Sequence, residues 1–376
     1  MKFARIKAFM FSLTMTIPTW AADPVTNLPP ENPPAVKQSI GQSAPAPAVA
    51  PVLVLPNADT VSVAREGFLF ECAAARPNYF TPYMLGDFVG PLANLFSDVK
   101  IAEGESPRPI DRVFYKFNYY NNLEKSRWAD PTQPIHSVSL VRNTFGFEKT
   151  FFNGQVSLGL RMPFNTIDAE AKEFQVAPDP VTGELVAVPG GPGISSTQFG
   201  NISAIAKAIL LEDRQSGSLI SGGVTISFPT ASSRLINLGM SEVTYMQPFL
   251  GFIWNRGDFF VQGFSSITFP LVHAESIVMF NDLGVGYYIY RGNSGWLKAV
   301  APTLEMHIED PLHQADAKAD LFGFFDTLKL HNVVDFTLGT TFEFANGATL
   351  AVGMATPVTG PKPFDFEVLA QVNFRF

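Results

Sequence analysis

Apolar and polar residues alternate in the last thirteen residues of the chain. One face carries Phe364, Phe366, Val368, Ala370, Val372, Phe374 and Phe376. The other carries Asp365, Glu367, Gln371, Asn373 and Arg375, with Leu369 as its one apolar member. Because successive side chains of a strand point to opposite faces, this pattern predicts a strand with an apolar face and a polar face.

The same alternation recurs from residue 112 onward and predicts twelve strands. They cover 112–120, 141–148, 155–162, 199–211, 220–228, 243–254, 259–269, 283–291, 296–308, 335–344, 349–356 and 364–376. A tilted strand needs about nine to eleven residues to cross a bilayer, which is close to the length of these segments.

The composition indicates a surface that meets something other than water. Hydrophobic residues make up 46% of the chain and charged residues 16%, whereas soluble proteins carry about 25% charged residues. Beyond the amino terminus the sequence has no run of about 18 apolar residues that could form a spanning helix. We therefore predict an all-β fold, an antiparallel up-and-down transmembrane β-barrel of about twelve strands over residues 112–376.

The closing strand resembles that of bacterial outer-membrane β-barrels, which end on an aromatic residue. In that family the terminal Phe signature, here Phe374 and Phe376, is read by the barrel-insertion machinery. The chain is also weakly similar to porin-like uptake barrels described as meta-pathway phenol-degradation-like, and this likeness transfers no substrate. Unpaired backbone groups are costly in hydrocarbon, so strand 364–376 is expected to pair with strand 112–120.

The connections and rims fit the same fold. Short connections are expected near 151–154, 212–217, 255–258, 292–295 and 345–347, and long ones at 121–137, 165–198, 229–242, 270–282, 309–331 and 357–363. Short periplasmic turns and longer external loops place both termini on the periplasmic side. Pro163, Pro229, Pro270, Pro311 and Pro357 are expected at strand ends. An aromatic girdle is expected at the opposite rim from Phe151, Phe152, Trp254, Phe259, Phe260, Trp296, Phe344 and Phe376.

The region before the barrel divides into three parts. Residues 1–21 have the basic start, apolar stretch and small-residue cleavage site of a signal peptide, and their removal changes the formal net charge from −8 to −11. Such an acidic chain is not expected to bind nucleic acid. Residues 22–64 are rich in Pro and Ala and are expected to form a disordered linker. Residues 65–111 are irregular, and a plug in the barrel mouth and a segment packed under the barrel both remain open.

Charged residues on the polar faces are expected to line the lumen. They are Lys116, Arg142, Glu148, Arg161, Lys207, Glu305, Asp335, Glu343, Asp365, Glu367 and Arg375. Two interpretations remain open: a network of ion pairs that narrows the pore, or a lining that orients a polar substrate. The balanced charges predict no preference for cations or anions.

One cluster has residue types suited to catalysis or metal binding, namely His307, Glu309, Asp310 and His313. Only His307 occupies a strand position that points inward, so solvated loop residues are the expected interpretation. The sequence therefore predicts no catalytic, metal or cofactor site and no enzyme. The single cysteine, Cys72, excludes an internal disulfide.

The function expected from this pattern is passive or facilitated passage of small solutes across the outer membrane of a Gram-negative cell. The expected partners are outer-membrane lipids, the barrel-insertion machinery and a small-molecule solute. The alternatives are a non-conducting structural or adhesive envelope barrel, an outer-membrane hydrolase that depends on His307, and a secreted β-sandwich.

Overall fold

The computed structural model describes residues 81–87, 100–123, 135–178, 183–190, 192–231, 243–271, 277–313, 332–360 and 362–376. The predicted signal peptide, the linker, Cys72 and residues 65–80 and 88–99 lie outside the described residues. Within the described ranges no helix has the length and apolarity needed to cross a membrane.

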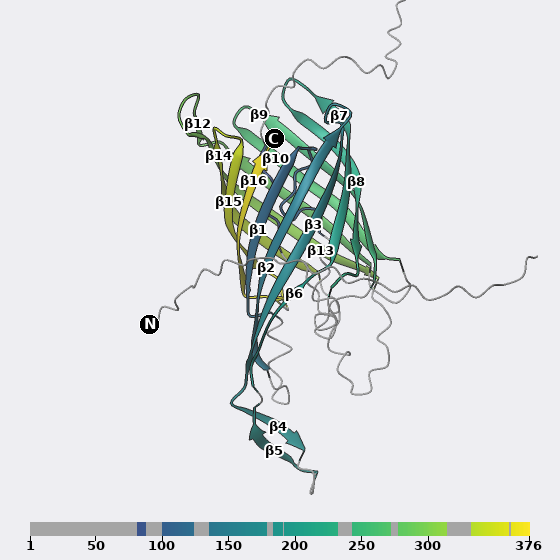
Figure 1. Cartoon of the computed structure of the whole chain (residues 1–376), viewed down its shortest axis with the longest axis vertical. Coiled ribbons are helices and arrows are strands. Elements are labelled where there is room, and N and C mark those ends of the chain that lie inside the picture. The colour runs from purple at the N-terminus through teal and green to yellow at the C-terminus, as the bar shows by residue number, and fades with distance from the viewer. Residues whose placement is uncertain are drawn as a thin grey trace, which may run out of the picture. The chain divides into compact units, whose positions relative to one another are not determined.

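Twelve antiparallel strands close into a barrel (Figure 1). In ring order they are β1 (Arg112–Asn121), β2 (Ile135–Phe151), β3 (Val156–Ala171), β7 (Ile202–Asp213), β8 (Ser218–Phe228), β9 (Tyr245–Arg256), β10 (Phe259–Pro270), β11 (Ile277–Tyr287), β13 (Leu297–His313), β14 (Val333–Phe344), β15 (Ala348–Pro357) and β16 (Phe366–Arg375). The ring closes because β11 pairs with β13 and β16 pairs with β1. The predicted all-β, twelve-stranded antiparallel barrel is confirmed.

The seam between the first and last strands is continuous. Val113 of β1 lies opposite Phe374 of β16, and Tyr119 lies opposite Val368. This is the pairing expected from the cost of an unpaired edge in hydrocarbon.

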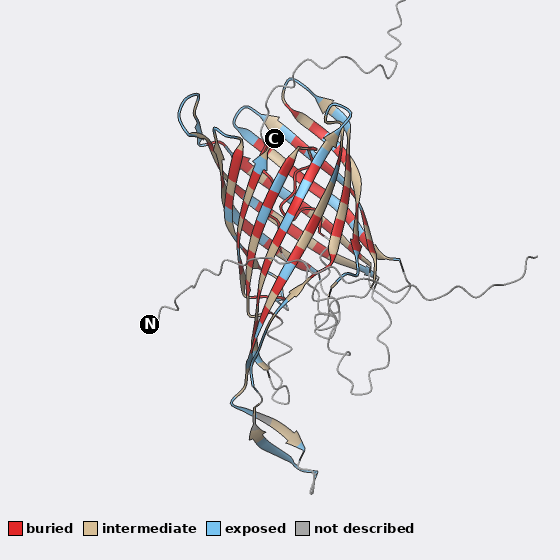
Figure 2. Ribbon diagram, in the orientation of Figure 1, coloured by how far each residue is buried: buried red, intermediate tan, exposed pale blue. Residues whose placement is uncertain are grey.

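Burial alternates along the strands, as Figure 2 shows. Leu338 is 65% exposed and Val368 is 41% exposed, whereas Asp335 and Glu367 are fully buried. The apolar face therefore points outward and the charged face points into the barrel. Phe364 departs from the prediction because it precedes β16 and is buried, with its ring centroid 6.0 Å from that of Tyr120.

One end of the barrel, here called the turn end, carries the short connections and lies uppermost in Figure 1. Asn153 and Gly154 both have positive φ in the predicted turn between β2 and β3. Trp296 stacks on Phe344 at this end, with ring centroids 5.7 Å apart. Phe260 was wrongly assigned to the aromatic girdle, because it points inward and is 1% exposed.

The opposite end, here called the loop end, departs more from the prediction. Strands β2 and β3 extend beyond their neighbours, and β6 (Ile194–Phe199) pairs with the extension of β3. The expected loop 165–198 also contains a two-stranded sheet of β4 (Phe174–Pro178) and β5 (Leu185–Pro189). These extra strands were missed because their pairing depends on the overhanging hairpin.

Two further boundaries were misplaced. Strand β11 was expected at 283–291 but spans Ile277–Tyr287, and β12 (Tyr290–Arg291) pairs separately with β13. Pro163 lies inside β3 and not at its end. Strand β3 pairs with β7 up to Arg161 and with β6 from Phe164, so the missing N–H of Pro163 falls where β3 changes partner.

Candidate functional site in the barrel lumen

Residues 81–87 and 100–111, here called the lumen segment, contact inward-facing side chains on both sides of the ring. Arg161 of β3 donates to the backbone oxygen of Lys100 (3.0 Å), and Glu305 of β13, half-way round the ring, accepts from the backbone N–H of Leu85 (2.9 Å). Residues 81–87 are all buried. Segments that touch strands across the ring in this way lie inside it.

The wall formed by β1, β2, β3 and β7 is rich in cations. This basic sector comprises Arg112, Lys116, Arg142, Arg161 and Lys207, all buried. Glu148 of β2 is also buried here, with one carboxylate oxygen 3.0 Å from Nε of Arg112 and the other 2.8 Å from Nζ of Lys207. One acid cannot neutralise five cations, so the wall needs further anions.

Glu105 of the lumen segment supplies one of them. Its carboxylate lies 2.6 Å from Arg112, 3.1 Å from Arg161 and 2.9 Å from Lys207. The backbone oxygens of Lys100 and Ile101 accept further hydrogen bonds from the Arg161 guanidinium at 3.0 and 3.2 Å. All four ionic side chains are nearly inaccessible to water, so this is a buried charge cluster and not a surface ion pair.

Glu103 supplies the second anion. Its carboxylate lies 3.2 Å from Lys116 and 3.8 Å from Arg142. A cavity of about 20 Å³ borders Glu103, Lys116, Arg142 and Arg161. That volume holds roughly one water molecule, so the lumen segment fills this side of the barrel closely.

A second part of the wall, formed by β11, β13 and β14 across the ring and by β16 next to β1, is rich in acids. This acidic sector comprises Asp282, Glu305, Glu309, Asp335 and Glu367, all buried. Lys100 of the lumen segment reaches it, with Nζ 3.3 Å from Asp282 and 3.4 Å from Glu309, and also contacts Asp87. The segment therefore presents the acids Glu103 and Glu105 to the basic sector, and Lys100 together with Asp87 to the acidic sector.

Glu305 holds the backbone of the lumen segment. The N–H groups of Leu85 and Gly86 each donate to its carboxylate at 2.9 Å. Gly86 has φ +77°, and a Cβ there would lie 2.6 Å from the Cα of Glu103. Glycine is required at this bend for both reasons.

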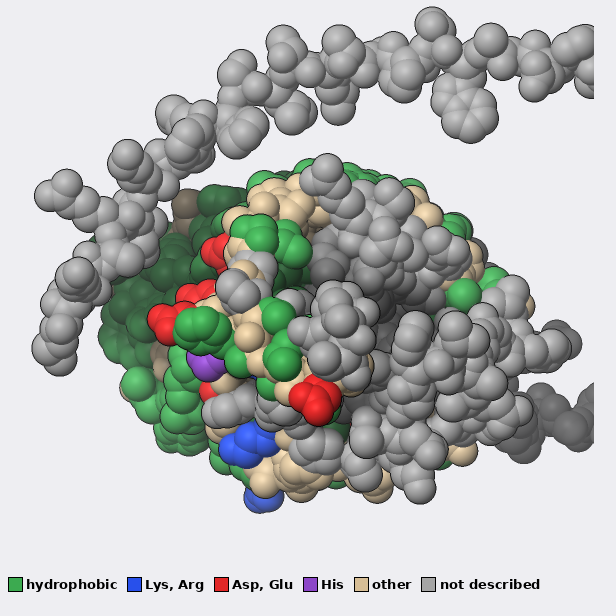
Figure 3. Space-filling view, turned by 90° about the horizontal axis from the view of Figure 1, so that it is seen from below, with side chains coloured by type: hydrophobic (Ala, Val, Ile, Leu, Met, Phe, Trp, Pro, Cys, Tyr) green, Lys and Arg blue, Asp and Glu red, His purple; other side chains and the backbone are tan. Residues whose placement is uncertain are grey.

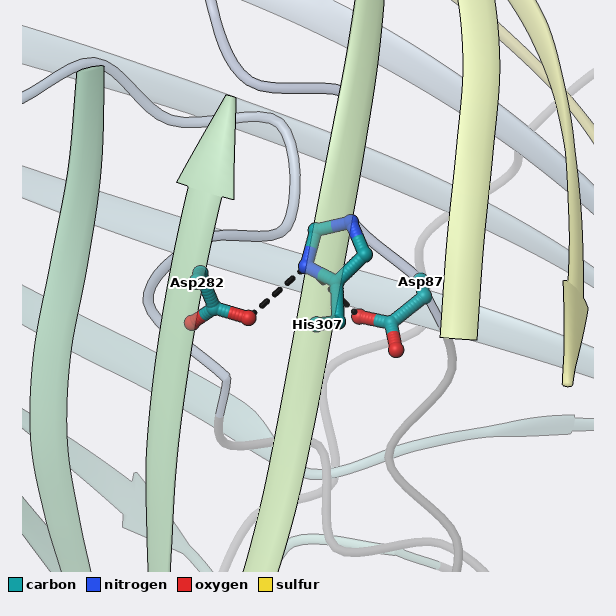
Figure 4. A group of neighbouring side chains, drawn as sticks. All are labelled: Asp87, Asp282 and His307. Carbon is teal, nitrogen blue, oxygen red and sulfur yellow. Dashed lines mark hydrogen bonds and ion pairs between the residues drawn. The ribbon is translucent and has the colours of Figure 1, made fainter. Parts of the chain in front are cut away.

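His307 of β13 lies between two carboxylates, one from β11 and one from the lumen segment (Figure 4). Its Nδ1 is 2.7 Å from Asp282 and 3.4 Å from Asp87, and its Nε2 is 3.3 Å from Glu305. The imidazole is fully buried. The imidazole therefore joins acids of the wall to an acid of the lumen segment.

Strands β8, β9 and β10 supply a third kind of wall. This neutral sector comprises Ser221, Thr225, Gln247, Gln262, Ser266 and Thr268, all buried. Their side-chain polar atoms have no hydrogen-bond partner among the residues that the structure describes. The charged groups described in the lumen segment thus engage two of the three sectors of the wall.

The residues predicted to line the lumen fall into two groups. Buried and facing inward are Lys116, Arg142, Glu148, Arg161, Lys207, Glu305, Asp335 and Glu367. Partly exposed are Glu343 and Arg375, which form an ion pair near the turn end, and Asp365, which accepts a hydrogen bond from Asn122 (2.9 Å). Glu309 was wrongly placed in a loop: β13 continues to His313, so Glu309 points inward and Asp310 outward.

Sequence reasoning missed several residues that the structure brings together here. They are Asp87, Lys100, Glu103 and Glu105 of the lumen segment, and Arg112 and Asp282 of the wall. Both wall residues occupy inward positions of their strands. Correct bounds for β11 would have found Asp282, whereas Arg112 was overlooked although the predicted strand 112–120 already contained it. The four segment residues carried no periodic signal.

The fold and the lumen together define a closed β-barrel with an ion-paired interior. No protein-family model matches the chain, and no curated protein matches it significantly. Among solved structures it is similar to an outer membrane channel from Pseudomonas putida F1 (TM-score 0.44, 9% identity, covering 71% of this chain and 96% of that one). It is also similar to the β domain of the Bordetella autotransporter BrkA (TM-score 0.40, 10% identity, covering 71% and 100%). LpxR from Salmonella typhimurium matches at a TM-score of 0.40 and 8% identity, covering 70% and 100%. These likenesses are too distant to carry information about function.

Proposed function

We propose that this protein is an outer-membrane channel for small polar solutes and that the lumen segment is a plug that holds it closed. The observation that carries the proposal is the reciprocal charge pairing between segment and wall. Glu103 and Glu105 face the basic sector, and Lys100 faces the acidic sector.

The outer surface supports the membrane location. Large hydrophobic side chains such as Phe147, Leu158, Leu250, Leu304 and Leu338 are each at least 45% exposed on the barrel wall. Figure 3, seen from the loop end, shows hydrophobic side chains along the visible flank of the barrel. An outward apolar surface on a sheet without edges suits a bilayer and not water. The proposed export signal is residues 1–21, and Phe374 and Phe376 are the proposed insertion signal.

The size of the ring favours a channel over a purely structural barrel. Eight-stranded barrels are filled by the side chains of their own walls, whereas wider ones enclose space. Here the filling comes from a segment that precedes the first strand and is not part of the wall.

The opposed sectors bear on the solutes that would pass. An opened lumen would place a basic wall opposite an acidic one, so solutes that carry both charges, or are polar and uncharged, fit best. Neither small cations nor small anions would be strongly preferred. No enzymatic activity is proposed. A hydrolytic activity that the wild-type protein shows and the His307→Ala variant lacks would contradict this.

Planar-bilayer recordings of the refolded full chain test the proposal. We expect a closed baseline with brief conductance steps, and a reversal potential close to zero in a potassium chloride gradient. A complete absence of steps over a wide voltage range would favour the structural-barrel alternative.

A further inference from the structure

On the basis of the channel function above, we propose that the solutes of this barrel are short peptides, and that the lumen segment occupies the place of such a peptide on the inner wall. The wall contacts the segment in three ways: through its backbone, its carboxylates and its apolar side chains. Peptides with free termini carry both charges, and such solutes suit a lumen that has a basic and an acidic sector.

Side chains of the wall bind the backbone of the lumen segment directly. They donate to six of its backbone oxygens and accept from two of its N–H groups. The oxygen of Gly104, for example, accepts from Arg112 and from Gln371, each at 3.0 Å. Most backbone groups in folded proteins pair with other backbone groups. Contacts from side chains to the main chain recognise the peptide bond itself, whatever the sequence of the peptide.

The basic sector binds carboxylates of the segment beside these peptide bonds. Three cations lie 2.6–3.1 Å from the carboxylate of Glu105, namely Arg112, Arg161 and Lys207. The guanidinium of Arg161 also donates to two backbone oxygens of the segment, at 3.0 and 3.2 Å. Guanidinium groups suit carboxylates because their N–H groups match the two oxygens. The carboxyl terminus or an acidic side chain of a peptide would present the same chemistry as Glu105.

An apolar part of the wall binds side chains of the same segment. Ile205, Phe249 and Phe264 face inward from β7, β9 and β10 and are each at most 5% exposed. They pack with Met84 and Ile101 of the segment, which are fully buried. Inward positions of transmembrane barrels are usually polar, so these three residues provide a site for an apolar side chain. The wall therefore suits a peptide with an apolar residue near its amino end and an acid near its carboxyl end.

A free peptide and the lumen segment compete for the same groups of the wall. The segment belongs to the chain, so its effective concentration is high and the wild-type protein should bind a free peptide weakly. Weakening the segment raises the fraction of barrels that can bind. Glu105→Gln should therefore tighten the apparent affinity for a peptide by about tenfold or more.

Fluorescence anisotropy of a dye-labelled pentapeptide, Ile-Ala-Glu-Gly-Glu, tests the proposal with the refolded full chain in a zwitterionic detergent. The probe has the sequence of residues 101–105. Glu105→Gln should bind it more tightly than wild type, whereas Glu170→Gln, at an exposed position outside the lumen, should bind it like wild type. Adding Arg161→Met to Glu105→Gln should weaken binding by about tenfold or more, because Arg161 is a donor to both a carboxylate and the backbone.

Glutarate shows whether the wall reads the peptide bond, because it has two carboxylates and no amide. Unlabelled pentapeptide should displace the probe at a concentration lower than that of glutarate by about tenfold or more. Equal displacement by the two compounds would overturn the proposal and leave a site for carboxylates alone. A Glu105→Gln protein that binds the probe no more tightly than wild type would also overturn it.

Far-UV circular dichroism checks that each variant is folded, and Glu103→Gln replaces Glu105→Gln in both tests if that variant fails. Because the readout is binding in detergent, it does not depend on whether the barrel conducts. A barrel that binds the peptide but shows no conductance would contradict the channel and not the peptide site. A conducting barrel that does not bind the peptide would contradict the peptide site alone.

Discussion

Glu105→Gln should open the channel, because Glu105 is the acid that, among the described residues, joins Arg112, Arg161 and Lys207 to the lumen segment. The three cations lie 2.6, 3.1 and 2.9 Å from its carboxylate, and its side chain is 3% exposed. Glutamine keeps the shape and removes the charge. Glu148 would still contact Arg112 and Lys207 in the variant, but Glu148 belongs to the barrel wall and does not hold the lumen segment.

The magnitude follows from the burial of the cluster. Removing one partner of a buried ion pair costs about 3–5 kcal/mol, because the other charge stays desolvated. In the open state the same cations would be hydrated, so this cost applies mainly to the closed state. Each 1.4 kcal/mol corresponds to a factor of ten, so the ratio of open to closed channels should rise by about a hundredfold or more.

Open probability in planar bilayers measures this ratio directly for wild type and variant. Glu170→Gln is the control, because Glu170 is exposed on the extension of β3 and contacts Ser137 there. The control should gate like wild type. A folded Glu105→Gln barrel with an unchanged open probability would refute the assignment of this cluster to closure.

Three further predictions concern the wall. Leu338→Arg puts a cation on the outer face midway along β14 and should lower the free energy of unfolding in liposomes by about 2–4 kcal/mol relative to Leu338→Ala; equal stabilities would argue against lipid contact. Gly339→Val should displace the lumen segment, since a Cβ at Gly339 would lie 2.2 Å from Cδ1 of Leu85 and 2.6 Å from the oxygen of Val352. Increased protease cleavage within residues 81–111 measures this displacement, and an unchanged digestion pattern would count against it. Phe376→Ala should reduce assembly in cells severalfold without affecting refolding in detergent, as compared by membrane fractionation and circular dichroism; normal assembly would remove the proposed signal.

The barrel itself was largely predictable because its information is local and periodic. Each strand must put apolar residues outward and polar residues inward, so Leu338 and Asp335 were assigned to the correct faces. Closure of strand 364–376 onto 112–120 followed from backbone hydrogen bonding alone. The prediction was wrong where this periodicity stops, as at Phe364, or where a strand overhangs the ring, as in β2 and β3.

The lumen was less predictable for a different reason. Inward positions such as Lys116 and Glu305 follow from the strand pattern, but their partners lie far away in the sequence. Leu85 and Glu305, for example, are hydrogen-bonded across 220 residues. No local pattern encodes a pairing of that kind, so Asp87, Lys100 and Glu105 carried no signal that reasoning from the sequence could use.

The most direct test of the account compares single-channel conductance in the full chain and in a variant that lacks residues 65–111. The account predicts a mostly closed full chain and a variant with long, stable conductance steps, because its basic and acidic sectors would be hydrated. Matching recordings from the two proteins, both folded as barrels by circular dichroism, would contradict the claim that the lumen segment closes the channel.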